Sequence, residues 1–563
     1  MSIRTPVSID GVVPWPDEIA AGYRKAGYWQ GSSLASFIAD QVTRRPDDEA
    51  VIDGAHRLTY RQLWDRSQSC AQALLGLDIA PGDRILVQLP NCWEFVALTF
   101  GCLRIGVVPV MALPAHRQYE LTHLATLSEA VAIVVADTDR DADLRQVAQQ
   151  VAAQAPSIRR VLVHGELSSG TTGYVPEYSI ESVLSTVAYF AAADYEPTGS
   201  DVACMLLSGG TTGLPKLIVR TNDDYVYNII RCNAISEFDS GTVYLGALPC
   251  SHNFPLACPG VLGALFAGGR AVMLPSPAPE RALRTIDAEG VTVAAVVPAV
   301  AQNWIEYQRA HHILRGDSFR VLQVGGSRMP DELAARVEPV LGARLQQVFG
   351  MAEGLINMTR LDDDLDIILN TQGRPVSDAD EVLVVDEEGN PVPDGTPGAL
   401  LTRGPYTPRG YFRAPEHNAR AFTPDGWYAS GDIVVRRPDG NLVVAGRDKD
   451  MINRGGEKIS AEEVENFAYQ LDGVELAAAV AMPDPVLGER LCLYITLAQG
   501  HSVTLTDIAE VMNKAGVARF KIPERLKIVT EMPTTKVGKI DKKALRADIS
   551  AHLTDSVTED ETR

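Results

Sequence analysis

Short apolar runs alternate along most of the chain with longer stretches in which apolar residues recur every few positions. Runs of about four to eight apolar residues have the length of buried strands. Such runs lie at 83–89, 132–138, 159–165, 202–208, 271–275 and 291–297. The segment from Leu58 to Leu77 is typical of an amphipathic helix. Strands that alternate with helices favour an α/β fold with a large share of parallel sheet.

The pattern changes at about residue 380, where short strand-like runs and turn residues predict a small β-rich subdomain at 380–395, 398–406 and 441–447. A further change lies near Arg447. Beyond it, Ser460 and Glu463 have the spacing of a capping box, which predicts that a helix begins at Ala461. A strand-like run follows at 491–498. We therefore predict two domains, 1–446 and 447–563, the second with an α+β fold.

Composition narrows the class of protein. The chain has 563 residues, of which 46% are apolar, and this is enough to form a large buried core. Its formal net charge of −21 repels nucleic-acid backbones. The eight cysteines include no CxxC pair, which argues against zinc ribbons and suits a reducing compartment. The N-terminus lacks the apolar core of a signal peptide, and the apolar stretch at 95–115 is interrupted by Arg104, Pro109 and Pro114. We expect a cytoplasmic protein that binds neither membrane nor nucleic acid.

Charge is unevenly distributed along the chain. From Lys514 to Arg546 there are ten Lys or Arg and three Asp or Glu, a local excess of seven positive charges. Such a stretch is either a solvated basic face or a surface that meets phosphate or an acidic partner.

A Gly- and Thr-rich loop follows the strand-like run 202–208 and reads SGGTTGLPK from Ser208 to Lys216. Glycines permit tight turns, so backbone N–H groups and threonine hydroxyls can surround phosphate oxygens, and Lys216 adds a positive charge. The Walker pattern GxxxxGK[ST] is absent. A shorter string, SSGTTG at 168–173, lacks the Pro-Lys that completes the loop. The full loop therefore predicts a phosphate site, with a surface loop of no function as the alternative.

The ordered motifs of the chain resemble those of the adenylate-forming superfamily, which includes acyl- and aryl-CoA synthetases, luciferases and peptide-synthetase adenylation domains. The motifs are SGGTTGLPK at 208–216, FGMAE at 349–353, SGD at 430–432, GRDKDMINRGGEKI from Gly446 and PTTKVGKIDKKAL from Pro533. The resemblance implies a large N-terminal domain, built from two α/β subdomains with parallel sheets and a small β-rich subdomain. It also implies a small, mobile C-terminal α+β domain.

The resemblance further implies that ATP converts a carboxylic acid into an acyl-AMP and pyrophosphate. It assigns catalytic roles to Lys539, to Glu353 as a ligand of Mg²⁺, and to Lys216. The residues it implies for ATP or AMP binding are Ser208, Gly209, Gly210, Thr211, Thr212, Gly213, Gly325, Gly326, Ser327, Phe349, Gly350, Met351, Ala352, Asp432 and Arg447. Asp432 would accept hydrogen bonds from the ribose, and Lys539 would reach the α-phosphate. Ala352 stands where the family has threonine, which removes one hydroxyl near the phosphates.

The segment from His252 to Gly260 resembles the acid pocket of stand-alone aryl-acid adenylating enzymes from siderophore pathways. The pocket residues implied are His252, Asn253, Phe254, Cys258, Gly325 and Ile356. Amino-acid-activating relatives carry Asp at the position of Asn253, where it pairs with the substrate ammonium. A neutral Asn253 therefore argues for an acid without an α-amino group. By this resemblance, relatives that act on 2,3-dihydroxybenzoate carry Ser where Cys258 stands and tend to carry Val where Ile356 stands, whereas salicylate activators carry Cys and tend to carry Leu. The weak donor Cys258 and the bulkier Ile356 therefore favour salicylate. The alternatives are 2,3-dihydroxybenzoate and a hydroxypicolinate-type acid.

The acceptor of the acyl group is implied by the C-terminal motifs. Lys449 stands at the hinge position of the family, and Gly455, Gly456 and Glu457 would border a tunnel for a pantetheine thiol. No carrier-domain serine motif follows Lys539, so we expect an aryl carrier protein in trans, as in siderophore or related nonribosomal peptide biosynthesis. An aryl-CoA product is the alternative. A carrier is commonly acidic, and the basic stretch 514–546 could steer it.

Two other classes of protein compete with this interpretation. A nucleotide-binding regulator that has lost catalysis would lack some of the charged motif residues, but Lys216, Glu353, Asp432 and Lys539 are all present. A P-loop NTPase would need the Walker pattern, which the chain does not contain.

Overall fold

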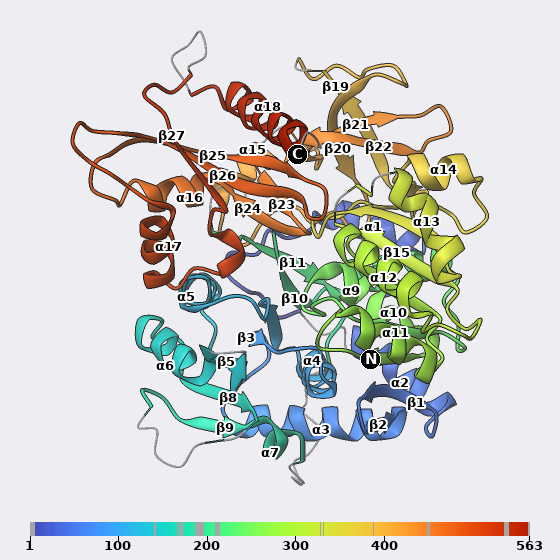
Figure 1. The fold of residues 1–563 in the computed structure, drawn as a ribbon. Helices are drawn as coiled ribbons and strands as arrows, with labels where there is room; N and C mark the ends of the chain where they lie inside the picture. Colours follow the sequence, from blue (N-terminus) through green and yellow to red (C-terminus); the bar gives the residue numbers. More distant parts are fainter. Residues whose placement is uncertain are drawn as a thin grey trace.

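The computed structural model describes residues 6–139, 142–165, 167, 173–185, 196–208, 214–326, 328–329, 331–386, 388–447, 451–533 and 540–560. Two large, mostly parallel sheets form the body of the molecule, and two smaller sheets follow them in the sequence (Figure 1).

The first large sheet has seven strands and is parallel except where its edge strand β11 pairs with β10. In sheet order its strands are β11 (Leu217–Thr221), β10 (Val202–Leu207), β4 (Val108–Met111), β3 (Arg84–Gln88), β5 (Ala132–Ala136), β8 (Arg160–His164) and β9 (Glu177–Ser179). A short β6–β7 ribbon (Thr138–Asp139, Ala142–Asp143) lies beyond β5 in the sequence.

The second large sheet has nine strands and is parallel in its centre, with antiparallel strands at both edges. In sheet order its strands are β18 (Arg374–Pro375), β17 (Ile356–Met358), β16 (Arg344–Gly350), β15 (Val321–Gly325), β14 (Val293–Val296), β12 (Val243–Gly246), β13 (Arg270–Met273), β1 (Glu49–Asp53) and β2 (His56–Thr59).

One hydrophobic core joins the two large sheets through a shared layer of helices, which are α2 (Leu34–Arg44), α3 (Tyr60–Gly76), α4 (Trp93–Ile105), α8 (Asn222–Ser236) and α10 (Gly260–Ala267). Outer helices cover the other faces: α5 (Gln118–Ser128) and α6 (Leu144–Gln154) on the first sheet, and α11 (Pro279–Glu289), α12 (Pro298–His311) and α13 (Asp331–Leu341) on the second. The other helices before residue 447 are α1 (Asp17–Lys25), α7 (Ile180–Ser185), α9 (Asn253–Ala257), α14 (Leu365–Asn370) and α15 (Pro415–Ala421).

The last part of the chain forms the two smaller sheets. The antiparallel four-stranded sheet contains β19 (Glu381–Val385), β20 (Pro397–Arg403), β21 (Tyr428–Arg436) and β22 (Leu442–Arg447). The five-stranded sheet contains β24 (Glu457–Ser460), β23 (Met451–Arg454), β26 (Gly488–Leu497), β25 (Val474–Asp484) and β27 (Arg525–Ile528). Helices α16 (Ala461–Ala468), α17 (Leu505–Lys514) and α18 (Lys542–Asp560) and a 3₁₀ turn, η1 (Arg519–Lys521), accompany it.

The fold class predicted from the sequence is confirmed. Each of the apolar runs before residue 300 contains a strand of a large sheet, and the β-rich segment forms the four-stranded sheet. Helix α16 begins at Ala461 as predicted, because the Ser460 hydroxyl accepts a hydrogen bond from the Glu463 N–H. Helix α3 begins later than the periodicity indicated, since Leu58 and Thr59 belong to β2 and Thr59 caps the helix.

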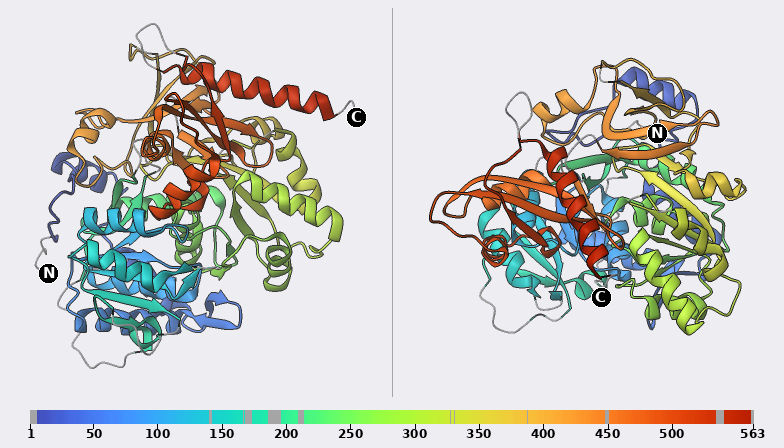
Figure 2. Two further views of the ribbon diagram at one scale, coloured as in Figure 1. Left: turned by 60° about the vertical axis from the view of Figure 1, so that its left-hand side comes forward. Right: turned by 45° about the horizontal axis from the view of Figure 1, so that its top comes forward.

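The C-terminal part, in orange and red, packs against the side of the body that carries α5 and beside the four-stranded sheet (Figures 1 and 2). Among the described residues, none of the helices combines the length and the apolar character needed to cross a membrane. The apolar stretch at 95–115 is divided between α4 and the central strand β4.

Candidate active site

The phosphate loop predicted from the sequence connects the hairpin strands β10 and β11. Its two ends are joined directly: the Ser208 N–H donates to the Lys216 carbonyl at 2.9 Å, and the Lys216 N–H donates to the Ser208 hydroxyl at 3.1 Å. These two hydrogen bonds close the base of the loop and fix the direction in which the segment leaves the sheet. The tip of the predicted site, Gly209 to Gly213, lies outside the described residues.

Tyr411 brings three of the predicted segments together. Its ring centroid lies 5.6 Å from the Lys216 Nζ, and its hydroxyl donates to the Glu353 Oε1 at 2.8 Å. The same hydroxyl lies 3.1 Å from the hydroxyl of Tyr428 on β21, the strand that also carries Asp432. Burial, together with the nearby Glu353 carboxylate, raises the pKa of Tyr411, so the phenol keeps its proton and acts as the donor. Tyr411 thus links the lysine, the carboxylate and the strand of the aspartate.

Glu353 lies in a tight turn between β16 and β17. The turn is closed by hydrogen bonds from the Gly354 N–H to the Met351 carbonyl at 3.1 Å and from the Met351 N–H to the Leu355 carbonyl at 3.2 Å. Beneath it, the buried Arg220 donates to the Ala352 carbonyl at 2.9 Å and pairs with Asp224 at 2.7 Å. Gly350 and Phe349 end β16, where they pair with Ile356 and Asn357. A buried ion pair therefore supports the turn that presents Glu353.

The predicted ribose site lies on neighbouring strands of the four-stranded sheet. Asp432 is buried, and its N–H donates to the Ser430 hydroxyl at 3.1 Å. The backbone of Arg447, on β22, is in register with Asp432. Since residues in register on adjacent strands are close neighbours, the sheet brings both positions to one place.

Asn253 forms the centre of the predicted acid pocket. It is buried; its Oδ1 accepts a hydrogen bond from the Tyr225 hydroxyl at 2.8 Å, and its Nδ2 lies 3.3 Å from the Cys258 Sγ. These bonds fix the amide so that its carbonyl faces Tyr225 and its N–H₂ group faces the thiol. Sulfur is a weak acceptor, so the amide retains donor capacity for a ligand.

Phe254 and Gly325 lie against each other in the same pocket. A Cβ on Gly325 would lie 2.8 Å from the Val348 carbonyl oxygen and 3.1 Å from the Phe254 ring, so only glycine allows this approach. His252 caps α9, with its Nδ1 accepting from the Phe254 N–H at 3.2 Å, which leaves Nε2 as the protonated nitrogen. Although His252 is exposed, the protein around its imidazole and the positive charge of Lys458 lower its pKa.

The predicted tunnel residues lie in a turn that contacts Val297 and Gly326, the residue after Gly325 of the predicted acid pocket. Gly456, in the turn between β23 and β24, has a φ of +94°, and a Cβ there would lie 2.7 Å from Val297. The Asn453 side chain donates to the Gly326 carbonyl at 2.7 Å. Burial raises the pKa of Glu457, although the positive charges of Lys521 and Arg454 act to lower it. Lys449, Ser327 and the catalytic lysine predicted at Lys539 lie outside the described residues.

Sequence reasoning missed Tyr411, Tyr225 and Arg220. Tyr411 lies in a segment rich in Gly, Pro and Arg, where an aromatic residue resembles a packing residue. Tyr225 and Arg220 lie near the start of α8 and on β11, and only the pairing of Arg220 with Asp224 four positions later has a recognisable spacing. Their roles come from contacts with residues more than 25 positions away.

The basic stretch 514–546 is partly neutralised within the molecule. Lys527 pairs with Asp548 at 2.7 Å, and Lys542 pairs with Glu465 at 2.7 Å. Lys521 is buried between Glu120 and Glu463. Lys543 is exposed. A docking surface for an acidic partner would therefore depend on Lys543 more than on Lys542.

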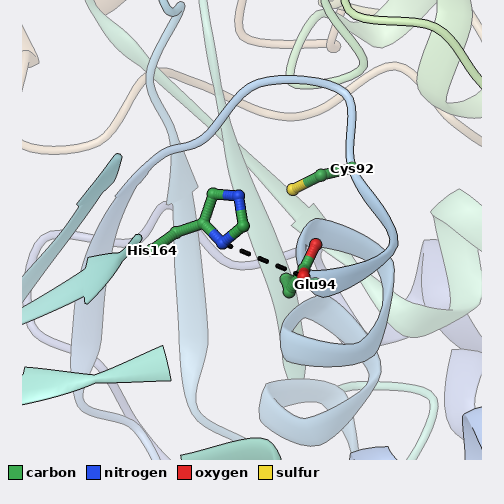
Figure 3. A group of neighbouring side chains, drawn as sticks. All are labelled: Cys92, Glu94 and His164. Atoms are coloured by element: carbon green, nitrogen blue, oxygen red, sulfur yellow. Dashed lines mark ion pairs between the residues drawn. The ribbon is translucent and has the colours of Figure 1, made fainter. Parts of the chain in front are cut away.

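A separate group of potential metal ligands lies at the start of α4. One ligand atom each of Cys92, Glu94 and His164 lie within 4.8 Å of one another (Figure 3). The His164 Nδ1 is 3.9 Å from Glu94 and 3.0 Å from Glu181, so the imidazole already has carboxylate partners. Burial raises the pKa of the Cys92 thiol. The group shares no residue with the predicted nucleotide or acid sites.

Comparisons with known proteins find matches over most of the chain. Residues 38–412 match the family model of the AMP-binding enzyme, and residues 463–539 match the AMP-binding enzyme C-terminal domain. A salicylyl-CoA synthase / salicylate adenylyltransferase of a Streptomyces species is 54% identical over 97% of this chain and 99% of its own length. A 2-hydroxy-7-methoxy-5-methyl-1-naphthoate–CoA ligase of Streptomyces carzinostaticus is 51% identical over 95% of this chain and 97% of its own.

A salicyl-AMP ligase / salicyl-S-ArCP synthetase of Mycobacterium tuberculosis is 45% identical over 95% of this chain and 94% of its own. Among solved structures, apo MbtA of Mycobacterium smegmatis superposes with a TM-score of 0.73 at 46% identity, covering 95% of this chain and 98% of that one.

Proposed function

The chain belongs to the AMP-binding enzymes and is an aryl-acid–AMP ligase that uses ATP; within this activity, we propose that its acid is salicylate and that the salicyl group passes to the phosphopantetheine thiol of an aryl carrier protein. The observation that carries the choice of acid is the arrangement around Asn253, whose amide is held between the Tyr225 hydroxyl and the Cys258 thiol. This wall of the pocket offers a neutral donor and no carboxylate.

In the first step, a carboxylate oxygen of the acid attacks the α-phosphorus of ATP. The bond from that phosphorus to the bridging oxygen breaks, and pyrophosphate leaves with the electron pair. The negative charge that moves onto the phosphates requires cations near the loop. We assign this task to Lys216 at the base of the loop, and to Lys539 at the α-phosphate. Asp432 and Arg447 would bind the ribose.

The carboxylate of Glu353 suits a magnesium ion, because hard cations prefer oxygen ligands. Tyr411 donates to one carboxylate oxygen and thereby orients the group, while the second oxygen can bind a cation. Bound there, Mg²⁺ would neutralise the phosphates of ATP. Ala352 supplies no hydroxyl at this turn, and its carbonyl is held by Arg220.

The pocket supports an aryl acid with one ortho-hydroxyl. The Asn253 N–H₂ group can donate to that hydroxyl, while Cys258 presents a small, weakly polar surface to the neighbouring ring position. The two Streptomyces relatives are named for acids whose hydroxyl is ortho to the carboxylate, on the neighbouring ring carbon. If a second hydroxyl is tolerated, 2,3-dihydroxybenzoate would be the alternative substrate.

In the second step, the thiol sulfur attacks the carbonyl carbon of salicyl-AMP. The carbon–oxygen bond to AMP breaks, AMP leaves, and the thiol proton passes to solvent. The turn at Gly455–Glu457 lies against Gly326 and Val297, and this proximity supports entry of a pantetheine arm there. Coenzyme A carries the same arm, and the names of both Streptomyces relatives favour it as the second candidate.

A competition experiment tests the acid and the acceptor together. The enzyme, ATP, Mg²⁺ and salicylate would be offered equal concentrations of a pantetheinylated aryl carrier protein and coenzyme A, and the thioesters would be quantified by mass spectrometry. We expect salicyl-AMP without an acceptor and the carrier thioester as the main product with both. If salicyl-CoA were the main product, coenzyme A and not the carrier protein would be the acceptor. An absence of salicyl-AMP would refute salicylate as the acid.

A further inference from the structure

Helix α5, on the outer face of the seven-stranded sheet, makes a buried ionic contact with the C-terminal part of the chain. The Lys521 Nζ, at the end of η1, lies 3.3 Å from the Glu120 Oε1 of α5 and 2.9 Å from the Glu463 Oε2 of α16. The side chains of Glu120, Lys521 and Glu463 are 0%, 5% and 2% exposed. A lysine from one side of the interface is thus enclosed by carboxylates from both sides.

Neighbouring contacts repeat the connection. The Ala518 N–H donates to the Glu120 Oε1 at 3.2 Å. The rings of Tyr119 and Phe467 meet edge to face at 5.5 Å, and Tyr119 packs against the apolar cluster of the C-terminal part. Gly516 approaches so closely that a Cβ there would lie 3.3 Å from Gln118. The start of α5 therefore forms a specific docking surface.

The ionic contact depends on the relative position of the two parts. Glu120 is ionised more readily than a free glutamic acid: burial opposes its charge, but Lys521 and two backbone N–H groups outweigh burial and lower its pKa. If the C-terminal part turned away, Glu120 would lose Lys521 and the Ala518 N–H, keep the Arg117 N–H, and exchange the lost partners for water. The contact consequently favours the arrangement in which it forms.

That arrangement is also the one that brings the 455–457 turn to Gly326, next to Gly325 at the edge of the predicted acid pocket. Asn453 donates to the Gly326 carbonyl, and the Gly456 Cα lies near Gly326. The ionic contact and the turn belong to the same five-stranded unit, since Arg454 pairs with Glu524 and β23 pairs with β26. Holding the unit at α5 therefore holds the turn at the pocket.

We propose that Glu120 is a positioning residue for the second half-reaction, because through Lys521 it holds the C-terminal domain with the 455–457 turn at the acid pocket. This inference rests on the proposed function, in which the turn admits the pantetheine thiol. The first half-reaction is assigned above to Lys539 at the phosphates, so we expect it not to require the contact of Glu120 with Lys521.

The test separates the two half-reactions in the full-length enzyme. Glu120→Gln keeps the size of the side chain and one acceptor for the Ala518 N–H, but removes the charge that Lys521 binds. We expect the rate of thioester formation to fall at least tenfold, with acid-dependent ATP–pyrophosphate exchange within twofold of wild type. Glu129→Gln is the matched control: it neutralises a half-exposed glutamate at the end of the same helix, whose partners Arg84 and Arg413 lie in the N-terminal part, and should change neither rate.

A charge exchange and a structural readout complete the design. Glu120→Lys combined with Lys521→Glu restores opposite charges and should recover part of the lost thioester rate. Hydrogen exchange of the segment 515–522 should be faster in Glu120→Gln than in wild type, with unchanged protection of the two large sheets. Equal losses in both half-reactions, or no loss in either, would overturn the positioning role. Failure of the wild-type enzyme to activate salicylate would instead concern the proposed function, and leaves the hydrogen-exchange comparison as the test.

Discussion

At the scale of single residues, Tyr411 organises the predicted nucleotide site. Its hydroxyl is bonded to Glu353 and lies beside Tyr428, and its ring faces Lys216. A hydrogen bond to a charged group contributes about 1.5–3 kcal/mol. The position of the Glu353 carboxylate therefore depends on a residue that no motif revealed.

Replacement of Tyr411 by Phe removes this bond and keeps the ring beside Lys216. We expect kcat/KM for adenylation to fall roughly tenfold, which corresponds to about 1.4 kcal/mol of transition-state stabilisation. Pyrophosphate exchange at varied concentrations of ATP and Mg²⁺ measures this kcat/KM. The control is Tyr174→Phe, because Tyr174 is 67% exposed. Unchanged kinetics would mean that the hydroxyl does not position Glu353.

Cys258 is the residue at which the choice of acid can be changed. Cys258→Ser replaces a weak donor with a hydroxyl beside the Asn253 amide. We expect the ratio of kcat/KM for 2,3-dihydroxybenzoate to that for salicylate to rise about tenfold, because discrimination between such close analogues is of this order. Cys250→Ser, the same change at another buried cysteine, should leave the ratio constant. A constant ratio in Cys258→Ser would remove Cys258 from the pocket's selectivity.

The motifs predicted residues whose chemistry is visible in the sequence, such as Lys216, Glu353 and Asp432. The structure brings the first two to Tyr411 and the third to the strand of Tyr428. The supporting residues could not be predicted, because a tyrosine hydroxyl acquires its role only from a partner that folding brings near. Glu463 illustrates this: its spacing indicated a capping box, yet its carboxylate binds Lys521.

At the scale of elements, strand β17 is anchored by hydrogen bonds that run through Tyr406 to Asp380. The Ile356 N–H donates to the Tyr406 hydroxyl at 3.2 Å, and that hydroxyl donates to the Asp380 Oδ2 at 2.5 Å. The other carboxyl oxygen, Oδ1, is buried and has no hydrogen-bond partner among the residues that the structure describes. The segment before β19 thus fixes the backbone at a residue of the predicted acid pocket.

This support predicts a pH dependence of stability. Burial raises the pKa of Asp380 from 3.8 to about 8, although the bond from Tyr406 opposes the shift. Between pH 4 and 8 the folded protein keeps a proton that the unfolded chain has lost, so the free energy of unfolding falls as pH rises, by at most about 1.4 kcal/mol per pH unit. Asp380→Asn removes this contribution. In urea unfolding, the free energy of unfolding of the variant relative to that of wild type should increase from pH 4 to pH 8. A difference between the two proteins that does not change with pH would contradict the raised pKa of Asp380.

At the scale of the whole molecule, one C-terminal domain serves both half-reactions in the proposed mechanism. The described arrangement places the 455–457 turn at the acid pocket and Glu120 against Lys521. The sequence predicted the α/β class from alternating strand-like and helix-like stretches, and the β-rich subdomain from short apolar runs and turn residues. It could not predict which faces of the two parts meet, because the contact joins residues about 400 positions apart.

Lys539→Ala tests the division of labour. Since this lysine is assigned to charge at the α-phosphate, we expect adenylation to fall at least a hundredfold, about 2.7 kcal/mol or more. Thioester formation from supplied salicyl-AMP should remain within a few-fold of wild type. Stopped assays of each half-reaction measure both rates, and equal losses would show that the lysine acts through folding or in both steps.

The choice of an ortho-hydroxylated aryl acid is tested by acid-dependent ATP–pyrophosphate exchange with salicylate, 2,3-dihydroxybenzoate, benzoate and 3-hydroxypicolinate in parallel. Salicylate should give the highest kcat/KM, 2,3-dihydroxybenzoate should follow, and benzoate should be weak because it offers no hydroxyl to the Asn253 amide. A higher value for 2,3-dihydroxybenzoate would contradict the role of Cys258 and Ile356, and a benzoate value equal to that of salicylate would contradict the role of Asn253.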